Sequence, residues 1–119
     1  LVIQPALRGI SMISTDADSR LVSAMAGENW HEFVQYCVAQ GCYGLENLSL
    51  IPGTVGACPI QNIGAYGVEV ADRLAWVEAI DLHSNELCRL SVADCQFGYR
   101  DSLFKQQVGR WLITQVCFK

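Results

Sequence analysis

Clustered positive charge and long apolar runs are both missing from this chain. It carries 8 Lys and Arg against 12 Asp and Glu, a formal net charge of −4, and its basic residues stand singly. Phosphate backbones and anionic lipid surfaces are bound through clusters of positive charge, so the composition predicts no nucleic-acid and no membrane partner. No apolar run approaches the roughly 20 residues that a membrane-spanning helix needs.

Metal-binding and phosphate-binding motifs are absent as well. There is no C-x-x-C, and the two histidines, His31 and His83, lie far from paired cysteines, so a zinc or iron–sulfur site has little support. Neither G-x-G-x-x-G nor a Gly-Lys-Ser/Thr phosphate loop occurs, so a nucleotide cofactor would need another architecture. No disulfide framework is required at this length. We expect reduced, mostly buried thiols at Cys37, Cys42, Cys58, Cys88, Cys95 and Cys117.

The chain has 119 residues, 51% of them apolar, which suits one domain with one core. The pattern is β-rich with helices inserted, which indicates an α+β fold with a mostly antiparallel sheet. The chain starts without Met, and its first three residues are typical of the middle of a strand, so we expect an excerpt of a longer protein. The expected strands are 10–13 and 21–25, joined by a turn at 15–19, then 73–82 and 86–91 around a turn at 83–85, and finally 108–118.

An amphipathic helix is predicted over residues 30–40. Asn29 is a suitable N-cap, Glu32 follows it by three residues, and Gly41 stands just beyond the end. The apolar positions recur at helical spacing at Trp30, Phe33, Val34, Cys37 and Val38, and this stripe is expected to lie on the sheet. Residues 91–94 are typical of a capping box that opens a short helical turn.

Residues 51–67 form the most informative segment. They hold 4 glycines, 2 prolines and no charge. A neutral loop of small residues is suited to lie against a large flat ligand, with backbone N–H groups donated to its polar edge. The alternative is a tight buried crossover in which the glycines only permit close packing.

A second informative segment is Phe97-Gly98-Tyr99-Arg100-Asp101-Ser102. An arginine is always charged and presents paired donors, so near a cofactor Arg100 can clamp a carboxylate or stabilise a developing enolate. The alternative is a structural arginine paired with Asp101 or Asp94.

Taken with Gly44-Leu45-Glu46-Asn47-Leu48, these segments resemble the UDP-N-acetylenolpyruvoylglucosamine reductase family, also called UDP-N-acetylmuramate dehydrogenase. The shared motifs are Ile-Pro-Gly-x-x-Gly, Pro-Ile-Gln-Asn-Ile-Gly-Ala-Tyr-Gly and Phe-Gly-Tyr-Arg-Asp-Ser, in the family's order and spacing. The resemblance implies an FAD-binding module of the vanillyl-alcohol-oxidase type and hydride transfer from NADPH through FAD to an enolpyruvyl ether of a nucleotide sugar. It implies that 1–119 is a single partial FAD-binding domain, mainly the second part of the FAD region, with the first part and the substrate-binding domain absent.

The resemblance also assigns roles to residues. It implies that Arg100 is the catalytic arginine, that Tyr99 and Tyr66 contact substrate, and that the serine proton donor lies outside this chain. It implies a cytoplasmic bacterial enzyme whose full-length form is monomeric, although the sequence leaves the oligomeric state open. The implied FAD-binding residues are Ile51, Pro52, Gly53, Gly56, Ala57, Ile60, Asn62 and Gly64.

Two other functions remain open: another flavin oxidoreductase of the same fold, and a non-catalytic β-rich binding module whose neutral loop merely packs. Several residues are expected to have only structural roles. We expect His31 and His83 to be surface or packing residues, Cys58 to be a small filler, and Trp30, Trp76 and Trp111 to pack in the core.

Overall fold

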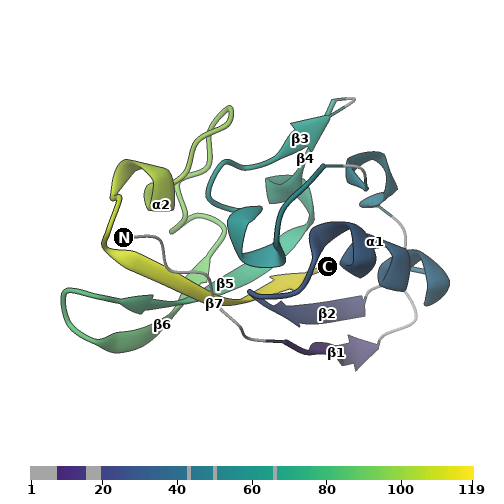
Figure 1. Ribbon diagram of the computed structural model, residues 1–119, viewed down its shortest axis with the longest axis horizontal. Helices are drawn as coiled ribbons and strands as arrows, with labels where there is room; N and C mark the ends of the chain where they lie inside the picture. The colour runs from purple at the N-terminus through teal and green to yellow at the C-terminus, as the bar shows by residue number, and fades with distance from the viewer. Residues whose placement is uncertain (1–7, 16–19, 43, 50, 66) are drawn as a thin grey trace.

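The computed structural model describes residues 8–15, 20–42, 44–49, 51–65 and 67–119, without the side chains of residues 13–15 and 20. One antiparallel sheet has the strand order β1-β2-β7-β5-β6 (Figure 1). Its strands are β1 (Ile10–Thr15), β2 (Arg20–Met25), β5 (Leu74–Asp81), β6 (Glu86–Ser91) and β7 (Trp111–Phe118). The predicted α+β fold with a mostly antiparallel sheet is therefore confirmed.

The last strand in sequence, β7, lies at the centre of the sheet, because it pairs with both β2 and β5. The chain between β2 and β5 crosses one face of the sheet and covers it (Figure 1). This covering layer holds α1 (Trp30–Ala39), the 3₁₀ turns η1 (Glu46–Leu48), η2 (Val55–Ala57) and η3 (Val70–Arg73), and a two-stranded ribbon of β3 (Gly64–Ala65) and β4 (Val68–Glu69). The uncharged segment thus lies within this covering layer.

The predicted helix forms almost as expected. The side chain of Asn29 accepts a hydrogen bond from the N–H of Glu32 at 3.0 Å, and Gly41 follows the helix with a φ of 76°. Trp30 and Phe33 are buried, and their rings meet that of Phe118 on β7, with ring centroids 5.8 and 4.8 Å away. The apolar stripe therefore packs on the sheet, as predicted, although its last member, Val38, is 39% exposed.

Both predicted hairpins form, as β1–β2 and β5–β6. Residues 16–19 of the first turn, and the strand expected at residues 1–3, lie outside the described residues. The closing strand begins at Trp111 rather than at Val108, because residues 107–110 form a turn in which Gly109 has a φ of 84°.

Two local predictions need correction. The side chains of Ser91 and Asp94 exchange the expected capping-box hydrogen bonds with each other's backbone N–H, but they open a turn and no helix. A four-residue helix, α2 (Leu103–Gln106), begins instead after Ser102, whose hydroxyl accepts from the N–H of Lys105 at 3.3 Å.

Trp76 was expected in the core, and this expectation is wrong. Val77 and Ala79 face the covered side of β5, so Trp76 faces the other side, half-buried, with the guanidinium of Arg89 3.9 Å above its ring. Trp30 lies in the core as predicted, and Trp111 packs against its edge, at right angles to the ring of Phe104.

In the part of the chain that the structure describes, none of the helices has the length and apolar character needed to cross a membrane. The same residues bring together no group of three or more His, Cys, Asp or Glu side chains that could hold a metal ion. Cys37, Cys58, Cys95 and Cys117 are buried, while Cys42 and Cys88 are half-buried.

Candidate functional site

The uncharged segment 51–67 and the segment 97–102 contact each other. The residues that are hydrogen-bonded between them are 36 to 42 positions apart in the sequence. Three side chains donate hydrogen bonds to backbone carbonyls across the contact. The Nδ2 of Asn62 donates to Gly98 at 2.8 Å, a guanidinium nitrogen of Arg100 donates to Gly64 at 2.9 Å, and the hydroxyl of Ser102 donates to Ile60 at 2.6 Å. The uncharged loop and the arginine-bearing turn therefore form one site.

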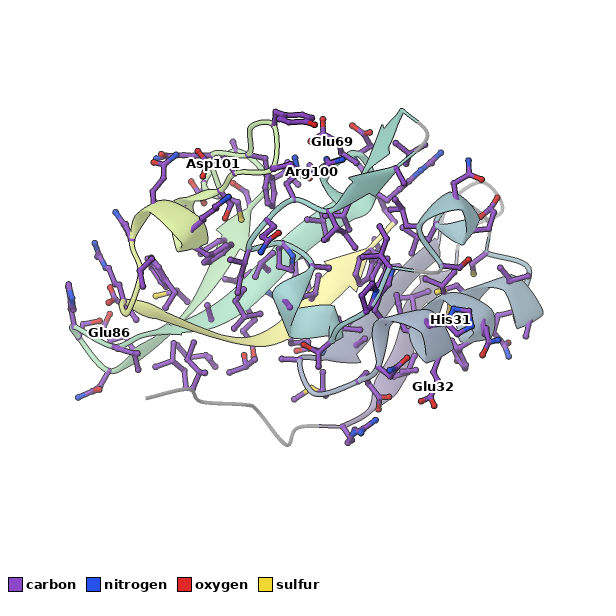
Figure 2. All side chains as sticks on the ribbon, turned by 45° about the horizontal axis from the view of Figure 1, so that its top comes forward. His31, Glu32, Glu69, Glu86, Arg100 and Asp101 are labelled. Carbon is purple, nitrogen blue, oxygen red and sulfur yellow. The ribbon has the colours of Figure 1, made fainter. Side chains whose placement is uncertain are left out.

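Arg100 lies at the upper edge of the molecule, between Asp101 and Glu69 (Figure 2). Its side chain is half-buried, and its guanidinium lies 4.8 Å from the ring centroid of Tyr99. The hydrogen bond to Gly64 uses one of the five N–H donors of a guanidinium, so donors remain for an anionic ligand. This arrangement can bind a carboxylate or stabilise negative charge that develops beside the loop.

The backbone of Arg100 is held in an unusual conformation. Its φ is 52°, in the left-handed region that a side chain with a Cβ rarely adopts. Gly98 and Asp101 exchange two backbone hydrogen bonds of 3.0 and 3.2 Å around it, and the Nζ of Lys105 donates to the Arg100 carbonyl at 2.9 Å. Strained backbone of this kind persists only where its surroundings over-determine it, and it is enriched at functional sites.

The alternative of an arginine paired with a neighbouring carboxylate is not what the structure shows. The described ion pairs do not include Arg100, and the carboxylate of Asp101 is engaged elsewhere. It accepts from the side chain of Gln106 and from the N–H of Ser102, both at 2.9 Å. These two hydrogen bonds stabilise the charged carboxylate and lower the pKa of Asp101 below its ordinary value.

The uncharged loop has a buried side and an exposed side. Val55, Gly56 and Cys58 are buried, in line with the packing of η2 on β7 and β2. Pro52, Gly53, Thr54, Ala57 and Gln61 are exposed, and Ile51, Ile60 and Gly64 are half-buried. The loop therefore combines the two possibilities left open by the sequence: one side packs on the protein and the other is open to a ligand.

Two of the glycines show this division. A Cβ built on Gly56 would lie 2.7 Å from the Cβ of Ala26, and the N–H of Gly56 donates to the Ala26 carbonyl at 3.0 Å, so this glycine permits close packing on β2's end. A Cβ built on Gly53 would meet nothing within 4 Å. Gly53 thus borders open space, whereas the Gly56 N–H is occupied inside the protein.

The remaining singled-out residues divide as follows. Tyr99 is 81% exposed beside Arg100, while Tyr66 lies outside the described residues. The Cys58 thiol is buried, and burial raises its pKa well above the ordinary value, so it is a protonated filler, as predicted. His31 contacts the Ser49 carbonyl through Nδ1, and His83 is exposed in the β5–β6 turn.

A hollow of about 440 Å³ lies elsewhere, between α1 and η1. Its lining includes His31, Val38 and Glu46. Arg100 lies at the upper edge of the molecule and His31 toward its lower right (Figure 2), and Arg100 does not line the hollow, so this hollow is not part of the candidate site.

Sequence reasoning missed the side chains that hold the site together. Asn62 was singled out only for ligand contact, and the contributions of Glu69 and Ser102 were not foreseen. Their sequence signal is weak, because their partners are 7 to 42 residues away and hydrogen-bond partners at such distances leave no local pattern.

Comparisons with known proteins give one consistent picture. Residues 1–91 match the family described as FAD binding domain. The chain is 58% identical over 118 residues to a curated protein of Pseudomonas fluorescens and 60% identical over 121 residues to one of Chromobacterium violaceum. Both are named UDP-N-acetylenolpyruvoylglucosamine reductase, and the alignments cover 99% and 100% of this chain.

A solved structure agrees with these relatives. The crystal structure of UDP-N-acetylenolpyruvylglucosamine reductase from Thermus caldophilus superimposes with a TM-score of 0.69 and 32% identity over 79% of this chain. The chain spans 35% and 36% of the two curated relatives and 34% of that solved chain, so it corresponds to about a third of such a protein.

Proposed function

The chain belongs to the FAD binding domain family, and from that premise we propose that it supplies part of the flavin site of an NADPH-using reductase. The proposed reaction reduces the enolpyruvyl group of UDP-N-acetylglucosamine enolpyruvate to UDP-N-acetylmuramate, for peptidoglycan synthesis in the bacterial cytoplasm. Its support is the 58% and 60% identity to curated reductases of that name over essentially the whole chain. The structural observation that carries it is the hydrogen bond from Arg100 to Gly64, which joins a cation to the uncharged loop.

In this proposal residues 1–119 are one partial FAD-binding domain, the second part of the FAD region. The rest of the flavin site and the substrate-binding domain belong to the two thirds of the relatives that this chain does not match. Because a binding site needs its full set of supporting residues, the chain alone is expected to hold FAD weakly and to be inactive.

The exposed side of the loop fits a flat, largely apolar ring. Pro52, Gly53 and Ala57 are exposed and uncharged, Ile51 and Ile60 are half-buried beside them, and the open space at Gly53 leaves room for close approach. FAD, when bound, supplies the transfer of hydride between NADPH and the substrate. These five residues are proposed to form the wall against it.

Gly56, Asn62 and Gly64 contribute to the proposed site in a different way. Gly56 sets the depth of the loop by packing on Ala26, and Asn62 and Gly64 hold the turn that bears Arg100. We propose that they support the wall in this way, besides the flavin contact that the resemblance implies for them.

Arg100 is proposed to bind the carboxylate of the enolpyruvyl group and to stabilise the negative charge that develops there when the substrate is reduced. Tyr99, exposed beside it, is proposed to contact the same substrate, and so is Tyr66. The proton that completes the reaction is proposed to come from outside this chain, as the resemblance implies. Ser102, beside Arg100 in the sequence, is fully buried with its hydroxyl donated to Ile60.

The test of this function is Arg100→Ala in the full-length protein that contains this chain. Removing a preorganised charge of this kind lowers turnover about 100- to 1000-fold, and the flavin absorbance of the purified protein should stay unchanged. Arg89→Ala is the matched control, because Arg89 also lies against an aromatic ring but on the other face of the sheet. Unchanged single-turnover reduction of the substrate by the Arg100 variant would overturn the role of Arg100.

The wild-type protein separates this function from its rivals. A colourless full-length protein would point to a non-catalytic module. A flavoprotein that oxidises NADPH but leaves the enolpyruvyl nucleotide sugar unchanged would be another flavin oxidoreductase of the same fold. For the isolated chain, titration with FAD should quench flavin fluorescence only weakly, and tight stoichiometric binding would contradict the assignment of a partial site.

A further inference from the structure

Asn62 is the most heavily engaged polar side chain at the contact between the loop and the turn. It is 2% exposed and has a φ of 46°. Its Nδ2 donates to the carboxylate of Glu69 and, at 2.8 Å, to the Gly98 carbonyl, while its Oδ1 accepts from the N–H of Ala71 at 3.0 Å. A buried amide with all of these bonds made has one orientation.

The partners of Asn62 decide which way its amide points. The Glu69 carboxylate only accepts hydrogen bonds, and the N–H of Ala71 only donates them, so the amide nitrogen must face Glu69 and the oxygen must face Ala71. Glu69 is itself fixed, because its side chain and that of Asp72 exchange hydrogen bonds with each other's backbone at the start of η3. The second Nδ2 hydrogen is thereby directed to Gly98.

Gly98 is the base of the turn that presents Arg100. The backbones of Gly98 and Asp101 exchange two hydrogen bonds, so Tyr99 and Arg100 form the tip of the turn between these two residues. The guanidinium then returns to Gly64, two residues from Asn62 in sequence. Two hydrogen bonds thus join the loop and the turn close together, one from Asn62 to Gly98 and one from Arg100 back to Gly64.

We propose that Asn62, oriented by Glu69, is a positioning residue that sets the place of Arg100 by holding the Gly98 carbonyl. This inference rests on the proposed function, since it deepens the role given to Arg100. The side chain of Asn62 thereby has a different role from those of the loop residues that face the ligand, because both of its polar atoms are hydrogen-bonded within the protein.

The first test does not depend on flavin or on activity. Asn62→Gly relieves the strain of the left-handed backbone and removes the side-chain hydrogen bonds. Asn85→Gly is the matched control, because it relieves the same kind of backbone strain, at a φ of 60°, in the exposed β5–β6 turn. Amide hydrogen exchange at Gly98 and Asp101, whose N–H groups are the hydrogen-bonded ones in this turn, should rise about tenfold in the Asn62 variant, with no change in β5 and β7. The Asn85 variant should leave all of these amides unchanged. Exchange at 98–101 that stays at the wild-type rate, or that rises equally throughout the sheet, would overturn the proposal.

The second test separates the two half-reactions in the full-length, FAD-loaded protein. After reduction by dithionite, the flavin should be reoxidised by the enolpyruvyl nucleotide sugar about 10- to 100-fold more slowly in the Asn62 variant. Reduction of the flavin by NADPH should be unchanged, because Arg100 acts on the substrate. Equal slowing of both half-reactions would mean general damage to the site and would overturn the positioning role.

Glu69 provides the graded variants, which also serve if the Asn62 variant fails to fold. Glu69→Gln keeps an acceptor oxygen for the Asn62 amide, whereas Glu69→Ala removes it. The Ala variant should slow the reoxidation step more than the Gln variant, and equal effects would count against the proposal. A wild-type protein without flavin, or without activity on this substrate, would overturn the proposed function, whereas the exchange result would still decide whether Asn62 holds the turn.

Discussion

Beneath α1 the chain is held mainly by apolar contact, with one buried hydrogen bond from the indole N–H of Trp30 to the Leu48 carbonyl. At the edge that carries Arg100 it is held by hydrogen bonds from several side chains to backbone carbonyls. Trp30, Phe33 and Phe118 bury their rings against one another with no charged group among them. At the other edge, Asn62 and Ser102 reach across from one segment to the other.

The two regions differ in how far they tolerate small displacements of side chains, as well as in how strongly they are held. Apolar packing is non-directional, so it fixes which faces are buried but accepts small rearrangements of the side chains. A hydrogen bond to a carbonyl weakens steeply with angle and distance, so it fixes position. The region beneath α1 is therefore expected to govern the stability of the domain, and the Arg100 edge is expected to govern the placement of one guanidinium.

The largest predicted effect on stability is that of Phe33→Ala. Phe33 is fully buried between Trp30 and Phe118, so truncation leaves a cavity and should lower the free energy of unfolding by about 3–5 kcal/mol. Denaturation by urea measures it. Amide exchange at residues 98–101, below the unfolding transition, should stay at the wild-type rate. A rise there would show that the two regions are coupled and would break the comparison.

Gly64→Ala should affect the site as well as the stability of the domain. A Cβ at this position would lie 2.6 Å from a guanidinium nitrogen of Arg100 and 2.8 Å from the Val68 carbonyl, so both the arginine and the β3–β4 ribbon must shift. We expect a loss of about 1–3 kcal/mol in the free energy of unfolding and loss of the Arg100 contact in a crystal structure of the variant.

The control for that prediction is Gly98→Ala, at the other side of the contact. A Cβ on Gly98 would meet the Asp101 side chain at 3.8 Å, an ordinary van der Waals distance. It should change stability by less than about 0.5 kcal/mol. Equal losses for the two variants would mean that the close approach of Arg100 to Gly64 does not matter.

Ser102→Ala should have a smaller effect. The Ser102 hydroxyl donates to Ile60 at 2.6 Å and accepts from the N–H of Lys105 at the start of α2. Loss of this cap and of the link to the loop should cost about 1–2 kcal/mol in the free energy of unfolding, together with faster amide exchange in 103–107. Ser102→Thr keeps the hydroxyl and tests whether the loss comes from the hydrogen bonds, and an Ala variant as stable as wild type would contradict the link.

How far the sequence predicted these two regions follows from the range of their contacts. The helix was predicted because its cap, its period and its terminal glycine are all local signals around Asn29 and Gly41. The resemblance brought the loop and the Arg100 segment into one site. The two segments touch at Gly64 and Gly98 through hydrogen bonds between residues that are 36 positions apart in the sequence. No local sequence pattern encodes contacts of that range.

The misplacement of Trp76 has a physical reason of the same kind. Alternation along β5 shows that Trp76 and Val77 face opposite sides, but it does not show which side is covered. Val77 and Ala79 are fully buried, which identifies their side of β5 as the covered one. Trp76 lies on the other side, under Arg89.

The smallest predicted effect concerns pH and lies outside both regions, at the end of β5. The guanidinium of Arg110 donates to both oxygens of Asp81, at 3.2 and 3.0 Å, and with the N–H of His83 it lowers the pKa of Asp81 below its ordinary value. A carboxyl group whose pKa is lower in the folded state stabilises the fold at pH values above its unfolded pKa of about 4. That contribution is lost as the pH falls through the lower, folded value.

Asp81→Asn removes this titration, so the free energy of unfolding should fall less between neutral pH and about pH 3 in the variant than in wild type. Urea denaturation across this range measures the difference. Arg110→Gln should reduce the pH dependence in the same direction, because it weakens the hydrogen bonding from Arg110 that contributes most to the lowered pKa of Asp81. Neither change should alter amide exchange at residues 98–101, since Asp81 and Arg110 make no described contact with that turn. If the free energy of unfolding depends on pH in the same way in wild type and variant, the ion pair makes no such contribution. A change in amide exchange at residues 98–101 would show that the Arg100 edge is sensitive to a charge pair on the sheet.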